Sequence, residues 1–93
     1  MRQIDVKKTA SKRMRALPPK HQRQVSQKIV SLALEPFQSD TKQLEGYTGI
    51  RRADIGEYRI IYTVTDVSLT IFIVGKRNDS DVYKRLNRLF KRG

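Results

Sequence analysis

The sequence predicts an α+β domain in which a twisted antiparallel sheet packs on a helical hairpin. Three observations predict this class. Two segments before residue 36 carry apolar residues at helical spacing, the pattern changes to strand-like runs from residue 50, and a basic amphipathic segment follows residue 81. The expected order is β-α-α-β-β-β-α, with a short N-terminal strand beside a three-stranded meander. A chain of 93 residues has the size of one domain, so we expect residues 1–93 to form a single unit.

An extended segment at residues 3–6 opens the chain, and the first helix follows it. Thr9 is the expected N-cap, because its hydroxyl can accept a hydrogen bond from a free backbone amide of the first turn. Ala10, Met14 and Leu17 then recur at helical spacing. The first helix is therefore short and has one apolar stripe.

Two prolines separate the first helix from the second. Pro18 and Pro19 end the first helix, because proline disfavours helix in the preceding residue and cannot donate a backbone hydrogen bond. Pro19 suits the first turn of a second helix that runs to about Leu34 and is closed by Pro36. The apolar stripe of this helix consists of Val25, Ile29, Leu32 and Ala33. Because the link is short, we expect the two helices to be antiparallel neighbours.

The second half of the chain has the pattern of strands. Residues 38–49 are expected to form a connecting loop. The expected strands lie at 50–55, 58–65 and 68–74, with turns at 56–57 and 66–67 between them. Adjacent apolar residues in the last two strands predict central strands covered on both faces. A loop at 75–81 leads to a helix at 82–92, whose inward residues are expected to be Val82, Leu86, Leu89 and Phe90.

The composition excludes several classes of function. The chain has no cysteine, which excludes disulfides and cysteine nucleophiles, and its one histidine excludes a multi-histidine metal centre. Asn78, Asp79 and Asp81 have oxygen ligands but too few carboxylates for a metal site, so we expect no metal and no cofactor. No apolar run is long enough to span a membrane, and the N-terminus lacks the apolar core of a signal peptide. We therefore expect a cytoplasmic protein.

The charge balance points to a polyanionic partner. Twenty Lys and Arg stand against nine Asp and Glu, which gives a formal net charge of +11. Repulsion at this charge is costly unless a partner carries the opposite charge, so we expect nucleic acid or an acidic protein. Solvated helix faces remain the simpler interpretation of the individual cations. The basic residues expected to face RNA or the ribosome are Arg51, Lys76, Lys84, Arg85, Lys12, Arg13, Lys20, Arg23 and Lys28.

Four side chains are candidates for chemistry on a phosphodiester. Local strand pairing can bring Arg52, Arg59 and Arg77 to one edge of the sheet, and Tyr83 opens the last helix beside them. Guanidinium groups bind phosphate oxygens in pairs and stay protonated, while a tyrosine can stack on a base or exchange a proton. RNA supplies its own nucleophile, the 2′-hydroxyl, so such a cluster favours RNA over DNA as the substrate.

Structural roles are the competing interpretation of the same residues. Arg59 and Arg77 can instead form ion pairs at the sheet edge with Glu57, Asp79 or Asp81, and Tyr83 can pack on the core. Three further tyrosines, Tyr47, Tyr58 and Tyr62, are expected to pack in the core, and His21 is expected to be exposed and without a role.

Three segments carry a resemblance to a known family. They are residues 44–47 (LEGY), residues 51–62 (RRADIGEYRIIY) and residues 73–83 (IVGKRNDSDVY), with LPP at 17–19 and EP at 35–36 before them. Together they resemble RelE-type toxins along essentially the whole chain. The resemblance implies the toxin half of a bacterial type II toxin–antitoxin pair that cuts mRNA in the ribosomal A site without a metal, through attack of the 2′-hydroxyl.

The resemblance also implies individual roles. Arg59 matches the arginine that stabilises the transition-state phosphate, Arg77 the arginine at the leaving group, and Tyr83 the tyrosine that acts as base and stacks on the substrate. Arg52 falls on a position where the family has a basic residue. The sequence departs from the family at Asp54, where a second basic residue is common, and Arg51 is the nearest substitute.

Two other functions are possible for this sequence, and a toxin also requires a partner protein. The same superfamily contains ParE-type toxins, which poison DNA gyrase without nuclease activity, and a catalytically silent RNA-binding module is a third possibility. Every toxin interpretation implies an acidic antitoxin that folds on binding. We expect it to contact Leu86, Leu89 and Phe90 and to displace or reorient the last helix, and we expect the free toxin to be a monomer.

Overall fold

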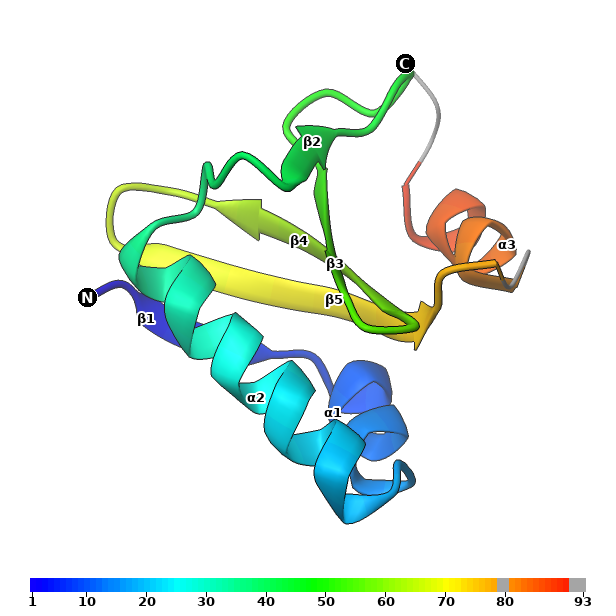
Figure 1. Ribbon diagram of the computed structural model, residues 1–93. Helices are drawn as coiled ribbons and strands as arrows, with labels where there is room; N and C mark the ends of the chain where they lie inside the picture. The colour runs from blue at the N-terminus through cyan, green and yellow to red at the C-terminus, as the bar shows by residue number, and fades with distance from the viewer. Residues whose placement is uncertain (79–80, 91–93) are drawn as a thin grey trace.

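A five-stranded mixed sheet lies at the centre of the computed structural model, which describes residues 1–78 and 81–90 (Figure 1). The strands are β1 (Gln3–Val6), β2 (Thr41–Gln43), β3 (Arg51–Ile55), β4 (Tyr58–Val64) and β5 (Ser68–Lys76), and the helices are α1 (Lys8–Arg15), α2 (Pro19–Leu34) and α3 (Asp81–Leu89). The spatial order of the strands is β1-β5-β4-β3-β2. The predicted α+β class, the helical hairpin and the β3-β4-β5 meander are confirmed.

Two details of the sheet differ from the prediction. The N-terminal strand β1 pairs in parallel with β5, from Gln3 opposite Ser68 to Val6 opposite Ile71, so the sheet is mixed rather than antiparallel. In addition, β2 lies inside the predicted loop and pairs antiparallel with β3. A strand of three residues is too short for an alternating pattern to be detected, and the partner of β1 is set by the tertiary fold.

The helices cover both faces of the sheet. The hairpin of α1 and α2 lies on one face and α3 lies on the other (Figure 1). Strand β4 alternates between them, because Ile60 packs with the helical hairpin and the neighbouring Ile61 packs with α3, both at 0% exposure. The prediction that the central strands are covered on both faces is therefore confirmed.

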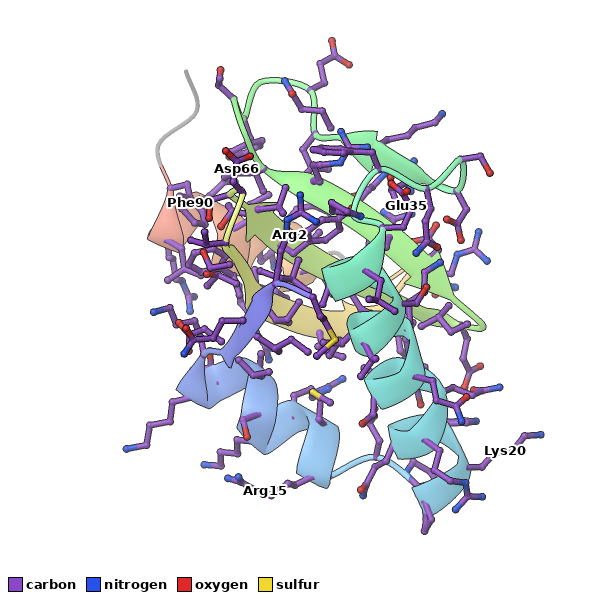
Figure 2. All side chains as sticks on the ribbon, turned by 90° about the vertical axis from the view of Figure 1, so that its left-hand side faces the viewer. Arg2, Arg15, Lys20, Glu35, Asp66 and Phe90 are labelled. Atoms are coloured by element: carbon purple, nitrogen blue, oxygen red, sulfur yellow. The ribbon has the colours of Figure 1, made fainter. Side chains whose placement is uncertain are left out.

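The helical hairpin matches its predicted pattern closely. Helix α2 begins at Pro19 and buries the predicted stripe of Val25, Ile29, Leu32 and Ala33. Helix α1 begins at Lys8, with Lys7 in the N-cap position and no side-chain capping bond, so the prediction of Thr9 as the cap is wrong. Figure 2 shows the side chains of Arg15 and Lys20 extending away from the ribbon near the link between the two helices.

Helix α3 packs on the sheet through few residues. Val82 and Leu86 are buried, and Phe90 contacts Phe72 edge to face, with 4.9 Å between the ring centroids. Leu89 is 54% exposed, so its prediction as an inward residue is wrong. The predicted continuation to residue 92 lies outside the described residues. No helix in the described part of the chain is long and apolar enough to cross a membrane.

Candidate functional site

Asp54 is the centre of a cluster of arginines on the face of the sheet that α3 covers. Asp54 on β3 and Arg59 on β4 are directly opposite each other in the β3–β4 hairpin. Arg59 binds the carboxylate with two nitrogens, because its Nε lies 2.8 Å from Oδ1 and its Nη2 lies 3.3 Å from Oδ2. This bidentate pair fixes the plane of the guanidinium group.

Two further arginines reach the same carboxylate. Arg52 lies two residues before Asp54 on β3, and its Nη1 is 3.1 Å from Oδ2 of Asp54. Arg77 follows β5, and its Nε is 3.4 Å from the same oxygen. Its Nη1 also donates to the carbonyl oxygen of Gly56 in the hairpin turn, at 3.3 Å. We call Arg52, Arg59 and Arg77 around Asp54 the arginine cluster.

Tyr83 joins the arginine cluster from α3. The Nη1 of Arg59 donates a hydrogen bond to the Tyr83 hydroxyl, and the guanidinium carbon lies 6.0 Å from the centre of the tyrosine ring. Tyr83 remains 38% exposed, so part of this residue is accessible to a ligand. The predicted four residues are thus brought together, and their roles in catalysis stay predictions.

Gly75 allows α3 to reach the cluster. It lies on β5 opposite Arg59, and a Cβ atom at this position would lie only 2.6 Å from Cγ2 of Val82. The first turn of α3 therefore packs directly on the backbone of β5. This close approach holds Tyr83, the next residue, against Arg59.

The electrostatics of the cluster follow from its three cations and one anion. Burial alone would raise the pKa of Asp54, but the hydrogen bond from Arg59 and the charges of Arg59, Arg52 and Arg77 outweigh it and lower that pKa. The hydrogen bond to Asp54 in turn raises the pKa of Arg59 above its ordinary value. Asp54 is therefore ionised at neutral pH, and the cluster keeps an excess of positive charge that can face a phosphate.

Arg59 and Arg77 form ion pairs, as the competing interpretation expected, but their partner is Asp54. Glu57 instead approaches His21, with 3.9 Å between its Oε1 and the imidazole Nδ1. Asp79 lies outside the described residues, and the side chain of Asp81 is not described. An internal carboxylate therefore orients the guanidinium groups.

The remaining predicted basic residues lie on several elements. Lys12, Arg13 and Arg85 line a groove between α1 and α3, whereas Lys76 on β5, Lys84 on α3, and Lys20 and Arg23 on α2 are exposed. Arg51 lies on the opposite side of the sheet from the cluster, 4.9 Å from the ring centre of Phe37, so it does not substitute for the missing base near Asp54. Lys28 does not lie on an exposed basic face, because its side chain is 10% exposed and binds Asp40 and Gln38.

The tyrosines and the histidine are placed as follows. Tyr47, Tyr58 and Tyr62 are buried, which confirms their packing role. His21 is half-buried, and its Nδ1 lies 2.7 Å from the hydroxyl of Tyr58, so it has a structural partner that the sequence did not indicate. Among the described residues, no group of three His, Cys, Asp or Glu side chains has the geometry to hold a metal ion.

Sequence reasoning missed a cavity next to the cluster. It has a volume of about 460 Å³ and lies between the β2–β3 segment and α3, with Arg52 and Tyr83 in its wall. Its other polar residues include Lys42, Gln43 and Asn87. Lys42 lies beside Arg52 because β2 pairs with β3, and this neighbour could not be predicted while residues 41–43 were expected to be part of a loop.

Comparisons with known proteins agree with this fold. The family model described as "ParE toxin of type II toxin-antitoxin system, parDE" matches residues 4–81. Among solved structures, a doubly substituted E. coli RelE toxin in the free state matches with a TM-score of 0.78 and 26% identity, over 96% of this chain and 98% of that chain. The isolated E. coli RelE toxin matches with a TM-score of 0.73 and 25% identity, over 97% and 100%.

A third solved structure contains a bound partner. The RelE–RelB complex from the archaeon Pyrococcus horikoshii matches with a TM-score of 0.73 and 28% identity, over 83% of this chain and 96% of that chain. A search of curated proteins found no significant match.

Proposed function

We propose that this chain, which belongs to the ParE toxin family of type II toxin–antitoxin systems within the RelE/ParE superfamily, is a ribosome-dependent mRNA endonuclease. The similarity of its fold to RelE toxins supports the proposal. The proposal places the cut in the A site, where the toxin inhibits translation. A ribosomal target requires the protein to act in the cytoplasm. The observation that carries the proposal is the placement of Tyr83 against Arg59 inside the arginine cluster.

The cluster has the groups that RNA scission needs. The 2′-oxygen of the ribose attacks the adjacent phosphorus, a 2′,3′-cyclic phosphate forms, and the bond from phosphorus to the 5′-oxygen breaks. Guanidinium groups stabilise the charge that builds on the phosphorane, because they donate in pairs to its oxygens. The 2′-proton leaves to a base and the 5′-oxygen gains a proton, so atoms and charge balance without a cofactor.

Each residue of the cluster has a distinct place in this proposal. Arg59 is held in position by Asp54 and faces the phosphorane oxygens, and Arg77 assists the leaving 5′-oxygen. Tyr83 has the hydroxyl that exchanges the 2′-proton, and it is a partly exposed aromatic residue on which a base can stack. Arg52 contributes positive charge in the wall of the neighbouring cavity.

Primer extension on purified ribosomes tests this function. A defined mRNA is programmed into ribosomes with and without the toxin, and the cut positions are mapped. We expect cuts confined to the A-site codon that disappear when ribosomes are omitted. Intact mRNA in the presence of folded protein would contradict the proposal.

Inhibition of DNA gyrase is the second candidate, because the description of the matching family model names the ParE toxin. It predicts that the protein inhibits supercoiling of a relaxed plasmid by purified gyrase and leaves ribosome-bound mRNA intact. The two assays, run on the same preparation, separate the candidates, since each predicts activity in one assay and none in the other.

We further propose that an acidic antitoxin is the partner of this chain. The RelE neighbours include one crystallised with RelB and one crystallised with an antitoxin peptide. Leu86 is fully buried here, so an antitoxin that contacts it must displace α3, whereas Leu89 is already exposed and Phe90 is half-buried. The groove between α1 and α3, with Lys12, Arg13 and Arg85 in its wall, matches an acidic segment in charge. We expect the free toxin to be monomeric and the complex with antitoxin to be larger, which light scattering on both samples can test.

A further inference from the structure

The first turn of α2 contacts the sheet directly behind the arginine cluster. Tyr58 and Arg59 are neighbours on β4, so their side chains point to opposite faces of the sheet. Tyr58 packs with the α1–α2 hairpin, whereas Arg59 binds Asp54 on the other face. On the hairpin face, the Nδ1 of His21 lies 2.7 Å from the hydroxyl of Tyr58. This contact is therefore one residue along β4 from the centre of the cluster.

Helix α2 meets the β3–β4 turn (residues 56–57) as well as Tyr58. The rings of His21 and Tyr58 pack edge to face, with 5.0 Å between their centroids, and Tyr58 is only 3% exposed. Glu57 approaches the same imidazole, with 3.9 Å between Oε1 and Nδ1. One turn further along α2, the Oε1 of Gln24 would lie 3.6 Å from a Cβ atom at Gly56. The start of α2 therefore lies against three consecutive residues of the β3–β4 hairpin.

The position of Arg77 depends on this same turn. The backbone amide of Arg77 donates to the carbonyl oxygen of Glu57 at 2.9 Å, and its Nη1 donates to the carbonyl oxygen of Gly56 at 3.3 Å. The side chain is 53% exposed, so packing restrains it little. Its other polar contact in the described part of the chain is the ion pair with Asp54. A displacement of the turn would move both carbonyl oxygens, and Arg77 with them.

We propose that His21 is a positioning residue of the arginine cluster, which acts through Tyr58 and the β3–β4 turn to keep Arg77 beside Asp54. The inference goes beyond the proposed function, because it concerns how the cluster is held and does not depend on which polyanion the cluster meets. The simpler alternative is a pair that only fastens α2 to the sheet. Such a pair would leave Arg77 in place when its hydrogen bond is removed.

Strand β4 offers a matched control for this hydrogen bond. Tyr58→Phe removes the hydroxyl that contacts His21 and keeps the ring. Tyr62→Phe makes the same change on the same strand, because Tyr62 is also buried and its hydroxyl donates to the carbonyl oxygen of Pro36 at 2.6 Å. Each variant removes one hydrogen bond from β4, but only Tyr58 is next to the turn. His21→Phe breaks the same bond from the α2 side, and His21→Asn keeps a polar atom near the position of Nδ1.

Hydrogen exchange of the full chain, followed by NMR, tests the inference without ribosomes. The reporter is the backbone amide of Arg77, because its hydrogen bond to Glu57 opens when the turn moves. We expect this amide to exchange about 5-fold to 50-fold faster in His21→Phe and Tyr58→Phe than in wild type, and within about twofold of wild type in Tyr62→Phe and His21→Asn. An unchanged rate in both test variants would overturn the inference. An equal increase in Tyr62→Phe would overturn it too, since the effect would then be a general loss of stability.

Single-turnover cleavage on ribosomes measures the consequence for activity, and this second test rests on the proposed function. We expect Tyr58→Phe to slow cleavage by about 5-fold to 50-fold at an unchanged half-saturating ribosome concentration, because Arg77 is misplaced while the binding surface is kept. In an Arg77→Ala background the same change should have no further effect, since Tyr58 acts through Arg77. If Tyr58→Phe slows wild type and Arg77→Ala by the same factor, the inference fails while the proposed function stands. If wild type cuts nothing on ribosomes, the proposed function fails, and the exchange rate of the Arg77 amide decides the inference.

Discussion

At the scale of single residues, Asp54 determines the arrangement of the candidate site. One carboxylate of 21% side-chain exposure lies within ion-pair distance of Arg52, Arg59 and Arg77, so it fixes three side chains that would otherwise repel one another. The sequence indicated that these arginines gather near Tyr83, and the structure brings them together. The binding of these arginines by Asp54 was not among the predictions, although the expected turn at 56–57 puts residue 54 opposite residue 59.

Replacing Asp54 by Asn should destabilise the fold at neutral pH by about 1–3 kcal/mol, since charged hydrogen bonds are lost and three cations are left close together. The pH dependence follows from the sign of the shift. The lowered pKa of Asp54 makes its contribution fully present above the pKa of the unfolded chain, and this contribution is lost as the pH falls through the lower folded value. Urea unfolding from pH 7 to pH 2 should therefore show a smaller loss of stability on acidification in Asp54→Asn than in wild type. Parallel curves for the two proteins would show that Asp54 is not held by the arginines.

At the scale of elements, the parts with strong local patterns were predictable and the short ones were not. Helix α2 shows its full apolar stripe in the sequence, and its boundaries follow from Pro19 and Pro36. Strand β2 has three residues and is defined only by its pairing with β3. The parallel pairing of β1 with β5 is likewise a product of tertiary packing, which no local pattern records.

The contact between β5 and α3 is the element-level feature on which the site depends. Gly75→Ala introduces a Cβ that would lie 2.6 Å from Val82, so α3 must shift. We expect a loss of about 1–3 kcal/mol in the free energy of unfolding and a clear loss of mRNA cleavage. Gly75→Ala combined with Val82→Ala removes the methyl that clashes, and it should lose less stability than the sum of the two single variants. Additive losses in this double-mutant cycle would place the effect of Gly75 elsewhere.

Helix α3 should also open independently of the sheet, because it is anchored mainly by Val82 and Leu86. Leu86→Ala removes a fully buried side chain, and we expect it to weaken this anchor by about 2–4 kcal/mol. The substitution should then increase the rate of hydrogen exchange more in the amides of α3 than in those of β4 and β5. Leu89→Ala is the matched control, since Leu89 is 54% exposed, and it should leave exchange in α3 nearly unchanged. An equal increase in α3 and in the central strands would show that the helix opens only with the whole domain.

At the scale of the whole molecule, the net charge of +11 acts in opposite directions on folding and on binding. Salt screens the repulsion between cations in the folded chain, and it also weakens contacts to phosphates. We expect the temperature of unfolding to rise, and the affinity for ribosomes to fall, as sodium chloride is increased from about 50 to 300 mM. Calorimetry and a ribosome pelleting assay at the same salt concentrations measure both. An affinity that does not change with salt would contradict a binding surface made of phosphate contacts.

The most direct test of the account is the rate of A-site mRNA cleavage by Arg59→Ala in single-turnover reactions on ribosomes. The control is Arg15→Ala, which removes an exposed arginine from α1 that contacts Ser11 and none of the cluster residues in the described part of the chain. If the arginine cluster stabilises the transition state, Arg59→Ala should be slower than wild type by about 10²–10³-fold, while Arg15→Ala should stay within about threefold. Equal rates for Arg59→Ala and wild type, with both variants folded, would show that the cluster is not the site of RNA cleavage.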